Sequence, residues 1–307
     1  MIDIIKYKHI PFIFSAVLFL TSVVLLITIG LKPGIDFTGG TLMELDFSES
    51  RPDLAQMQEV LDAQELGTVL VQPVDSTGYI IKMAYLNEDQ HQQVLNAIRT
   101  NFQQGEERIL EKRLETVGPS ISNELTERAT KTGVVVVLAI VIYVAYAFRK
   151  VTQPISSWKF GVTAIIALLH DVLITMGVFV LLGKYAGVEV DIPFIVALLT
   201  ILGYSVNDTI VVFDRIREKL LLRGGQGFAD TINKSIHETI PRSINTSGTT
   251  VLVLLALFLF GGESIRYFAL ALIIGIGFGT YSSIFLASPL LLVWHTLDEK
   301  FRKTKKA

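Results

Sequence analysis

Hydrophobic residues along this chain gather into six long runs that are separated by polar segments. Each run is close to the roughly 20 apolar residues that a helix needs to cross the hydrocarbon core of a bilayer. The pattern therefore predicts a polytopic α-helical membrane protein with six transmembrane helices. We expect these helices to cover residues 10–30, 132–148, 160–182, 192–213, 243–260 and 267–293.

The long polar segment after the first span, residues 31–131, combines two periodicities. Alternating apolar and polar residues predict strands, and a 3.6-residue spacing predicts helices. The order is strand 39–47, helix 53–67, two strands within 68–85, helix 87–102 and strand 108–117. Because this βαββαβ order resembles a ferredoxin-like unit, we predict one α+β domain here, outside the membrane.

A second polar segment, residues 214–242, separates the fourth and fifth spans within the predicted five-helix bundle 132–294. Apolar residues recur in it every four positions, at Phe228, Ile232, Ile236 and Ile240. This spacing predicts an amphipathic helix. Such a helix lies either in the plane of the membrane interface or against the underside of the helix bundle, and the sequence allows both.

Composition agrees with the membrane class, because half of the residues are hydrophobic, 18% are charged and the mean hydropathy is +0.51. The absence of cysteine excludes disulfides, thiolate metal sites and a cysteine nucleophile. The sequence also has no G-x-x-x-x-G-K-[ST] loop and no G-x-S-x-G motif. We therefore expect a protein that is not an enzyme and has no cofactor or metal. The ion gradient across the membrane remains as an energy source.

Charge predicts how the spans are oriented. Residues 31–130 carry 17 Asp and Glu against 8 Lys and Arg, and 16 of the other 19 basic residues lie on one side of a six-span arrangement. Basic loops stay in the cytoplasm, so we expect residues 1–9 and 295–307 there and 31–131 outside. The first span is expected to be an uncleaved anchor. The 16 residues are Lys6 and Lys8, then Arg149, Lys150 and Lys159, then those of segment 214–242, then those from Lys300 to Lys306.

The fourth predicted span contains a carboxylate, Asp208, within the stretch YSVNDTIVVF. An aspartate at the centre of a spanning helix costs roughly 2.5–3.5 kcal/mol, so its presence needs a reason. Asp208 shares a helical stripe with Tyr204 and Asn207, and we expect this stripe to face the bundle interior, with Thr209 beside it. Two interpretations are possible. Either hydrogen bonds hold the Asp208 carboxylate in a purely structural role, or the carboxylate takes up and releases protons, and we favour the second.

His170 and Asp171 are neighbours near the middle of the third predicted span. Adjacent side chains on a helix point about 100° apart, so at most one of them faces the fourth span. Histidine titrates near neutral pH and could take part in proton transfer. Alternatively, the two side chains satisfy each other, and Asp171 has a supporting role.

Polar residues also cluster where the fifth predicted span begins, in RSINTSGTT. Asn245 and Thr246 are among the hydroxyl and amide side chains that follow Arg242, which predicts a polar crevice along this side of the helix. Arg242 cannot lose its proton in a protein. It either pairs with Asp208 at a similar depth or extends its guanidinium toward the membrane surface.

Small residues mark one face of the sixth predicted span. Gly275 and Gly279 form a G-x-x-x-G pattern, and Gly277, Ser282 and Ser283 lie nearby. Such residues let helix backbones approach closely, so we expect this face to pack against another helix.

Taken together, several motifs resemble those of the SecD/SecF family. They occur in the family's order and at fitting spacing, so the resemblance covers essentially the whole chain. One short external domain and a single set of six spans are similar to the SecF branch rather than to SecD or a fused SecDF. The motifs are GIDFTGGTLMEL at 34–45, ETVGPSIS at 115–122, ALLHD at 167–171, YSVNDTIVVFDRIRE at 204–218 and RSINTS at 242–247.

The resemblance implies a subunit of the bacterial Sec protein-export machinery in the inner membrane, with residues 31–131 in the periplasm. It implies half of an arrangement similar to resistance-nodulation-division (RND) transporters. The implied partners are SecD, the SecYEG channel, YajC, the translocating unfolded polypeptide and the lipid bilayer, with no nucleic acid. The implied energy source is the proton-motive force, and some relatives use Na⁺ instead.

The same resemblance ties two of the polar residues, Asp208 and Arg242, to proton conduction. Four further residues are family landmarks near the junction of domain and membrane, although their glycines could also serve turn geometry alone. These landmarks are Gly34, Asp36, Gly39 and Gly40.

Two other functions stay open at the level of sequence. One is a non-conducting scaffold that stabilises the translocon, and the other is a subunit of an RND-type exporter of small molecules. Exporters of that type carry two large external domains in a duplicated chain, whereas this sequence shows no internal duplication.

Overall fold

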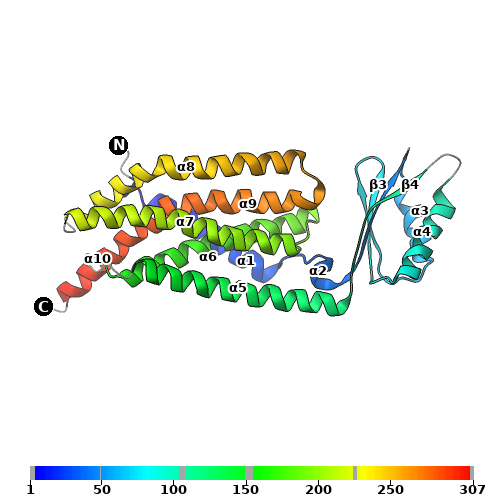
Figure 1. Cartoon of the computed structure of the whole chain (residues 1–307), viewed down its shortest axis with the longest axis horizontal. Helices are drawn as coiled ribbons and strands as arrows, with labels where there is room; N and C mark the ends of the chain where they lie inside the picture. Colours follow the sequence, from blue (N-terminus) through cyan, green and yellow to red (C-terminus); the bar gives the residue numbers. More distant parts are fainter. Residues whose placement is uncertain (1–3, 49, 104–107, 149–154, 224–226, 305–307) are drawn as a thin grey trace. The chain divides into compact units, whose positions relative to one another are not determined.

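The structure is a computed structural model that describes residues 4–48, 50–103, 108–148, 155–223 and 227–304 (Figure 1). It divides into two compact units, one made of Met1–Lys32 with Lys131–Ala307 and the other of Pro33–Thr130. Arg149 and Lys150, and the last basic residues of the tail, Lys305 and Lys306, lie outside the described residues.

The Pro33–Thr130 unit is built on a four-stranded antiparallel sheet in the order β2-β3-β1-β4. Two helices connect its strands, so the elements follow one another in the predicted βαββαβ order. The elements are β1 (Gly40–Phe47), α3 (Leu54–Asp62), β2 (Leu70–Val74), β3 (Gly78–Met83), α4 (Glu88–Phe102) and β4 (Ile109–Val117).

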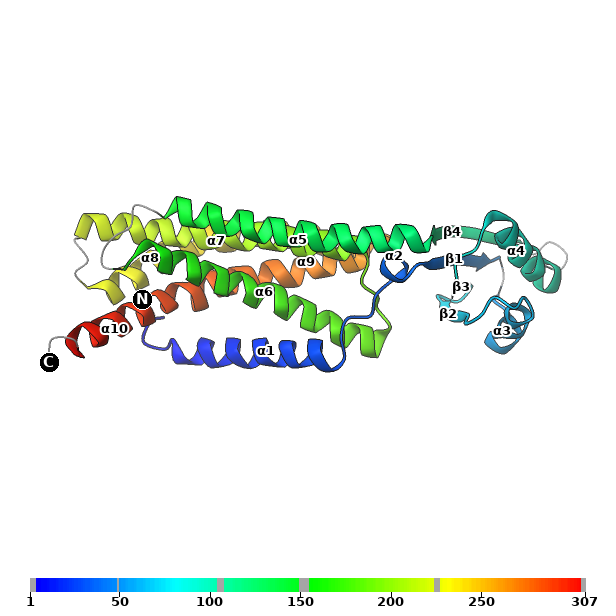
Figure 2. The ribbon, with the colours of Figure 1, turned by 90° about the horizontal axis from the view of Figure 1, so that it is seen from below.

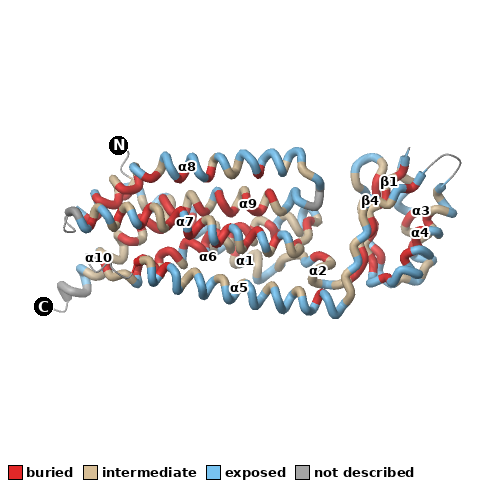
Figure 3. The backbone as a smooth tube through the Cα atoms, viewed as in Figure 1, coloured by how far each residue is buried: buried red, intermediate tan, exposed pale blue. Residues whose placement is uncertain are grey.

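Alternation along the strands creates the core of this domain. Met43 and Leu45 of β1 are fully buried while Glu44 between them is not, so one sheet face is covered (Figure 3). Met57 and Leu61, four residues apart on α3, belong to the same core. Helix α4 begins with a capping box. The Asn87 side chain accepts a hydrogen bond from the backbone N–H of Gln90, and the Gln90 side chain accepts one from the backbone N–H of Asn87.

The GIDFTGG motif folds into a short helix, α2 (Ile35–Thr38), that leads into β1. Gly39 and Gly40 have φ angles of +72° and +131°, which L-residues with side chains rarely adopt. A Cβ on Gly40 would lie 2.8 Å from the backbone oxygen of Met83. Gly34 has an ordinary φ of −81°, so turn geometry accounts for the second and third glycines of the motif but not for the first.

We expect Gly40→Ala to lower the free energy of unfolding by about 1–3 kcal/mol, because the substitution combines an unfavourable φ with a clash against backbone. Thermal unfolding of the purified full-length chain measures this effect. Gly118→Ala is the matched control, because its Cβ would meet only the ring of Tyr85 at 3.6 Å. Equal loss in both variants would contradict the explanation.

The other unit is a helix bundle, and the described residues contain six helices long and apolar enough to span a membrane. The chain is therefore a multi-pass membrane protein, as predicted. Each helix contains its predicted span apart from the last two residues of the span at α1 and the last residue of the span at α5, and most are longer than predicted. They are α1 (His9–Thr28), α5 (Pro119–Ala147), α6 (Ser157–Ala186), α7 (Ile192–Arg223), α8 (Phe228–Phe260), and a sixth span composed of α9 (Glu263–Ser282), π-helix η1 (Ser283–Ala287) and α10 (Ser288–Thr304).

The polar segment between the fourth and fifth spans is not a separate helix in a membrane interface. Its first part continues α7 and its last part is the beginning of α8, which runs through Pro241 without a break. Phe228, Ile232 and Ile236 are buried in the core of the bundle together with Ile216 of α7. The amphipathic pattern thus reflects packing against the bundle, which was the second of the two predicted alternatives.

Helices α6, α7 and α9 form the centre of the bundle, while the outward faces of α5 and α8 are exposed (Figure 3). Helix α1 lies beside α6 (Figure 2). Their close approach occurs at Gly177 of α6, where an added Cβ would lie 2.4 Å from the hydroxyl of Ser22. In the first turn of α6, the Lys159 ammonium lies over the rings of Trp158 and Trp294. It also forms an ion pair with Asp298, and this contact joins α10 to α6.

The G-x-x-x-G face of α9 packs against α7, as predicted. A Cβ on Gly275 would lie 2.2 Å from Ile201, and one on Gly279 would lie 3.1 Å from Ser205. Gly277 lies on the exposed side of the same helix and has open space around it.

Gly275→Ala is expected to destabilise the bundle by about 1–3 kcal/mol, because Ile201 must move to make room for the methyl group. Gly277→Ala is the internal control and should leave stability unchanged or raise it slightly. Melting of both variants in detergent micelles makes the comparison, and a Gly275 variant as stable as the control would show that the helices repack freely.

Candidate functional site

The centre of the bundle holds two buried carboxylates, Asp171 of α6 and Asp208 of α7. Asp171 is fully buried and Asp208 is 7% exposed. Both lie inside spanning helices, where a carboxylate is costly unless it is paired or hydrogen-bonded. Their surroundings therefore decide what each of them can do.

Asp208 is held by two serine hydroxyls from two further segments of the bundle. Ser243 of α8 donates to Oδ1 at 2.6 Å, and Ser283 of η1 donates to Oδ2. Among the described residues, no Lys, Arg or His lies within ion-pair distance of this carboxylate. Asp208 is thus bonded only to neutral donors, in a site that α7, α8 and η1 form together.

Asp171 has a fuller set of partners. Its Oδ1 lies 2.8 Å from Nδ1 of His170, and its Oδ2 accepts from Ser205 of α7 at 2.5 Å and from Ser282 of α9 at 2.8 Å. The side chains of His170 and Asp171 are therefore hydrogen-bonded to each other, as in one of the two predicted alternatives, although this bond uses only Nδ1 of the imidazole. The carboxylate also ties α6 to α7 and α9.

Two consecutive serines connect the two carboxylates. Ser282 donates to Asp171 and Ser283 donates to Asp208, at the point where α9 changes into the π-helix η1. The Ser288 hydroxyl donates to the Ser283 carbonyl at 2.8 Å, which supports the widened turn. Short π-helical segments are rare and often occur at functional sites. A movement of this segment would change the hydrogen bonds of both carboxylates at once.

The predicted pairing of Asp208 with Arg242 is not present as an ion pair in the described part of the chain. Arg242 is exposed and reaches Asp208 only by longer-range charge interaction, while its neighbour Ser243 makes the contact. The reason is helical geometry, since the side chains of Arg242 and Ser243 point about 100° apart and only one of them can face α7.

Several other predicted site residues lie on the outer side of the bundle. Asn207 is exposed, although the sequence predicted that it faces inward beside Asp208. Asn245 and Thr246 are exposed too and form an open polar face of α8, whereas Ser243 and Ser247 of the same polar run are buried. Together with Arg242, the exposed residues form a polar stripe on the surface of α7 and α8, which we call the outer polar stripe.

Three predicted residues do lie in the interior and leave polar atoms without hydrogen-bond partners among the described residues. They are buried atoms of an imidazole, a phenol and a hydroxyl, in the middle of the bundle. Such orphaned groups are costly in an apolar interior and call for an explanation. The atoms are Nε2 of His170, the hydroxyl of Tyr204 and Oγ1 of Thr209.

A surface cavity of about 450 Å³ lies at the ends of α7 and α8 near Arg242. Glu238 of α8 crosses it to Arg215 of α7 at 2.7 Å and to Lys219 at 2.5 Å. These ion pairs hold the two helices together where they extend beyond the apolar part of the bundle. Arg242 lines the same cavity.

The sequence did not reveal the serines as partners of the carboxylates. Ser282 and Ser283 look like small residues for helix packing, and Ser205 has no feature that separates it from other serines. The signal that was available is the adjacent pair Ser282-Ser283 in an otherwise apolar span, together with Ser243 at the start of another. No cluster of acidic and histidine residues within the described ranges could hold a metal ion.

Six spanning helices, one extramembrane α+β domain and a centre of serine-bound carboxylates define a multi-pass membrane protein of the transport class. The chain belongs to the SecD/SecF family. A family model described as "Protein export membrane protein SecD/SecF, C-terminal" matches residues 97–297, and one described as "SecD/SecF GG Motif" matches residues 24–50.

Curated relatives of similar length carry the name "Protein translocase subunit SecF". The protein from Thermobaculum terrenum is 39% identical, with 99% of this chain and 98% of that protein aligned. The protein from Desulfurispirillum indicum is 40% identical, with 94% and 93% aligned. The predicted membership of the family is therefore confirmed over essentially the whole chain.

The crystal structure of SecDF from Thermus thermophilus, described as a translocon-associated membrane protein, has a related fold. It matches 96% of this chain with a TM-score of 0.81 and 34% identity. A structure of SecDF in a super-membrane-facing form matches with a TM-score of 0.65. This chain spans 39% of the length of each of these SecDF chains.

Proposed function

We propose that this chain is the SecF-type subunit of a SecDF complex that uses the proton-motive force to assist protein export through the Sec translocon. The observation that carries the proposal is Asp208, a buried carboxylate that hydrogen-bonds only to neutral hydroxyls. The proton gradient across the membrane, and not a bound nucleotide, supplies the energy. The subunit therefore acts as a transport component rather than as an enzyme.

The environment of Asp208 supports a change of protonation during function. An ionised carboxylate in an apolar interior is expensive unless an opposite charge pairs with it. The two serine bonds offset only part of this cost, since a hydrogen bond to a charged group contributes roughly 1.5–3 kcal/mol. The charged and neutral forms of Asp208 therefore prefer different surroundings, which is what an ion-coupled site requires.

The serines offer a way for protonation to change helix contacts. Ser283 donates to Asp208, and its hydroxyl also lies 3.0 Å from the backbone oxygen of Thr280. A hydroxyl has one hydrogen to donate. When Asp208 takes up a proton and becomes a weaker acceptor, the Ser283 hydroxyl turns to Thr280, and the link between α7 and η1 is released.

The energies are of a suitable size for such a switch. Moving one charge across the membrane yields about 2.3 kcal/mol per 100 mV. This compares with a net contribution of about 0.5–1.5 kcal/mol for a typical neutral hydrogen bond. One proton per cycle is therefore sufficient to exchange a small number of hydrogen bonds around Asp208, and no cofactor is needed.

The outer polar stripe supports a partner subunit in the membrane. Asn207, Arg242 and Asn245 are exposed on spanning helices, where contact with lipid tails would leave them poorly solvated. A second membrane subunit covers such a stripe, and SecD is the partner that the family implies. In the assembled complex, the neighbouring subunit would bring its own groups close to Arg242 and Asp208.

The remaining parts of the proposal follow the charge pattern and the family. Both termini lie in the cytoplasm and the Pro33–Thr130 domain lies in the periplasm of a bacterial inner membrane. SecYEG, YajC and the emerging unfolded polypeptide are the proposed partners. Movement of the bundle after protonation of Asp208 is transmitted to the domain through α1 and α5, which both lead into it.

Proton flux through the purified complex tests the proposal. The SecDF complex is reconstituted into vesicles with a pH-sensitive dye inside, and an imposed potential drives protons inward. We expect Asp208→Asn to reduce the flux to the level of empty vesicles, whereas Asp214→Asn, at an exposed position on the same helix, leaves it unchanged. Equal flux in wild type and Asp208→Asn would overturn proton coupling through this carboxylate, and flux that requires Na⁺ would change the coupling ion.

A further inference from the structure

Two connections join the helix bundle to the Pro33–Thr130 domain, the end of α1 and the beginning of α5. They are attached differently. The first residues of α5, as far as Thr130, belong to the domain unit, and its side chains pack on the bundle core further along, at Val136, Ile140 and Val144. The segment that follows α1, in contrast, is attached to the bundle directly before the domain begins.

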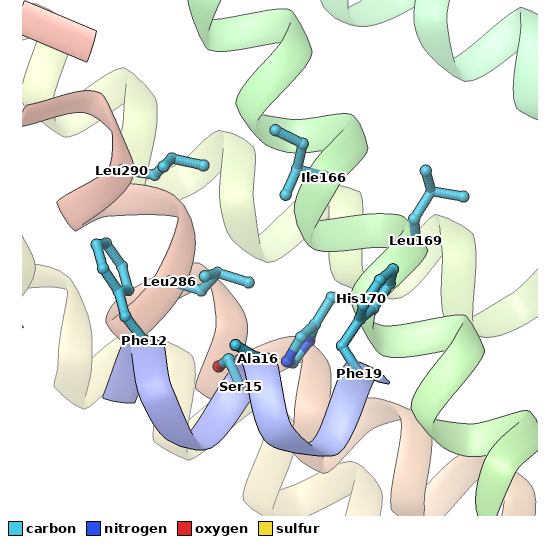
Figure 4. A pocket seen from close by; sticks show the side chains of 9 residues that line it. All are labelled: Phe12, Ser15, Ala16, Phe19, Ile166, Leu169, His170, Leu286 and Leu290. Carbon is cyan, nitrogen blue, oxygen red and sulfur yellow. The ribbon is translucent and has the colours of Figure 1, made fainter. Parts of the chain in front are cut away.

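Helix α1 itself is held to the bundle at separate points. Ser15 donates to the hydroxyl of Tyr281 in α9 at 3.2 Å, and Ser22 lies against Gly177 of α6. An apolar crevice of about 270 Å³ remains between α1, α6 and the segment from η1 to α10 (Figure 4). These contacts connect α1 with α6 and α9, and the residues beyond its end add a contact with the loop that joins α6 to α7.

That contact is made by Lys32, the last residue before the domain unit. Its backbone oxygen accepts a hydrogen bond from the N–H of Val190 at 2.8 Å, and its ammonium lies 3.3 Å from Oε1 of Glu189. The same ammonium lies 3.5 Å from the backbone oxygen of Gly187. We call these three contacts between Lys32 and the loop 187–191 the Lys32 latch.

The loop 187–191 is fixed to the helices on both of its sides. The side chain of Asp191 accepts a hydrogen bond from the backbone N–H of Phe194 at 3.0 Å, in the first turn of α7. Val188 and Val190 are buried in a core to which α6, α7 and α9 all contribute. A loop held in this way moves with the ends of α6 and α7, which carry Asp171 and Asp208.

The charges of the latch fix its alignment. The side chains of Lys32 and Glu189 are 38% and 17% exposed, and an ion pair of this kind contributes little to stability by itself. A backbone hydrogen bond can form between residues of any type, so the ion pair determines which residue of the loop lies beside Lys32. Gly183 of α6 permits the close approach, since an added Cβ would lie 3.3 Å from the Cβ of Lys32.

We propose that the Lys32 latch transmits the movement of α7 to the Pro33–Thr130 domain, with Lys32 and Glu189 as positioning residues of the coupling step. The proposal rests on the proposed function, because the movement starts with the protonation of Asp208. Asp208 lies about 24 Å along α7 from Ile192 at a rise of 1.5 Å per residue. A helix carries a displacement over such a distance as a rigid element. The latch stays closed throughout, so the loop displaces the chain that enters the domain at Pro33.

Charge reversal tests the latch in the SecDF complex, with export and proton flux measured on the same vesicles. Lys32→Glu and Glu189→Lys should each reduce the stimulation of export by the gradient about fivefold, because an attraction across 3.3 Å becomes a repulsion. Proton flux should stay at the wild-type level. The double variant Lys32→Glu/Glu189→Lys should restore export. Lys184→Glu, at an exposed position near the same end of α6, is the matched control and should change neither measurement.

The two measurements separate the latch from the proposed function. Absence of flux in the wild-type complex would overturn the proposed function and the latch with it. Normal flux together with normal export in both single reversals, or failure of the double variant to restore export, would overturn the latch alone.

A covalent link tests whether the latch stays closed. Because the chain has no cysteine, Lys32→Cys and Glu189→Cys can be joined selectively with a short bifunctional maleimide. We expect the cross-linked complex to keep the stimulation of export by the gradient, and the same variant without the cross-linker to lose most of it. Loss of stimulation on cross-linking would show that the contact must open, which contradicts the proposal.

Discussion

Asp208→Asn is expected to abolish the stimulation of protein export by the proton-motive force, while the binding of SecD persists. Asparagine is close in size to aspartate and keeps an oxygen that accepts from Ser243 or Ser283, so the helices stay packed. It cannot take up a proton near neutral pH, so the switch between charged and neutral states is lost. Export of a preprotein into inverted membrane vesicles, with and without an imposed gradient, measures the effect.

Two kinds of control separate coupling from damage. Asp214→Asn, six residues further along α7 at an exposed position, should keep full stimulation. Ser243→Ala and Ser283→Ala each remove one of the two bonds and should weaken stimulation without eliminating it. A normal response to the gradient in Asp208→Asn would refute the mechanism. Loss of SecD from the purified variant would instead support the scaffold function, in which the buried polar groups serve assembly.

Asp171→Ala should destabilise the chain more than any other single substitution considered in this protein, by about 3–5 kcal/mol. The fully buried carboxylate receives hydrogen bonds from His170, Ser205 and Ser282. Alanine removes this acceptor from all three groups, and among the described residues only the Ser282 hydroxyl keeps another, the backbone oxygen of Gly279 at 3.1 Å. Cavity formation adds to this cost. The loss appears as a lower melting temperature of the purified chain in detergent.

Comparison with the individual donors makes this prediction specific. Ser205→Ala or Ser282→Ala removes one hydrogen bond and should cost about 1 kcal/mol. Asp171→Asn should fall between these variants and Asp171→Ala, since its amide still accepts on one side. Should Asp171→Ala melt like wild type yet lose gradient-dependent export, Asp171 would be an ion carrier rather than the structural link between α6, α7 and α9.

Much of the fold could be predicted from the sequence, because hydrophobic length and period are local properties. The runs of apolar residues placed the six spans, and alternation placed the strands of the Pro33–Thr130 domain. The ends of the helices were harder to predict. Polar residues at 119–131 and 228–242 extend α5 and α8 beyond their apolar runs, and hydropathy cannot detect a helix that continues into water.

The site was predicted less completely, for a geometric reason. Sequence showed that Asp208 and Asp171 lie in spanning helices, and the structure buries both. It could not show which direction a helix faces, so Asn207 was expected inside although it lies on the outer polar stripe, and the two alternatives for Arg242 could not be separated. A rotation of about 100° separates neighbouring residues, and only the packing of all helices decides which neighbour is inside.

The π-helix η1 has a consequence for the remainder of the chain. A π-turn contains one residue more than an α-turn, so α10 is rotated by about 100° relative to a regular continuation of α9. The facing direction of every residue after Ala287 depends on that single additional residue. Trp294 and Asp298 contact Lys159 in this phase. The turn that brings Ser283 to Asp208 therefore also sets the rotation of α10 about its axis. The same turn thus determines both the hydrogen bond to Asp208 and the side of α10 that contacts α6.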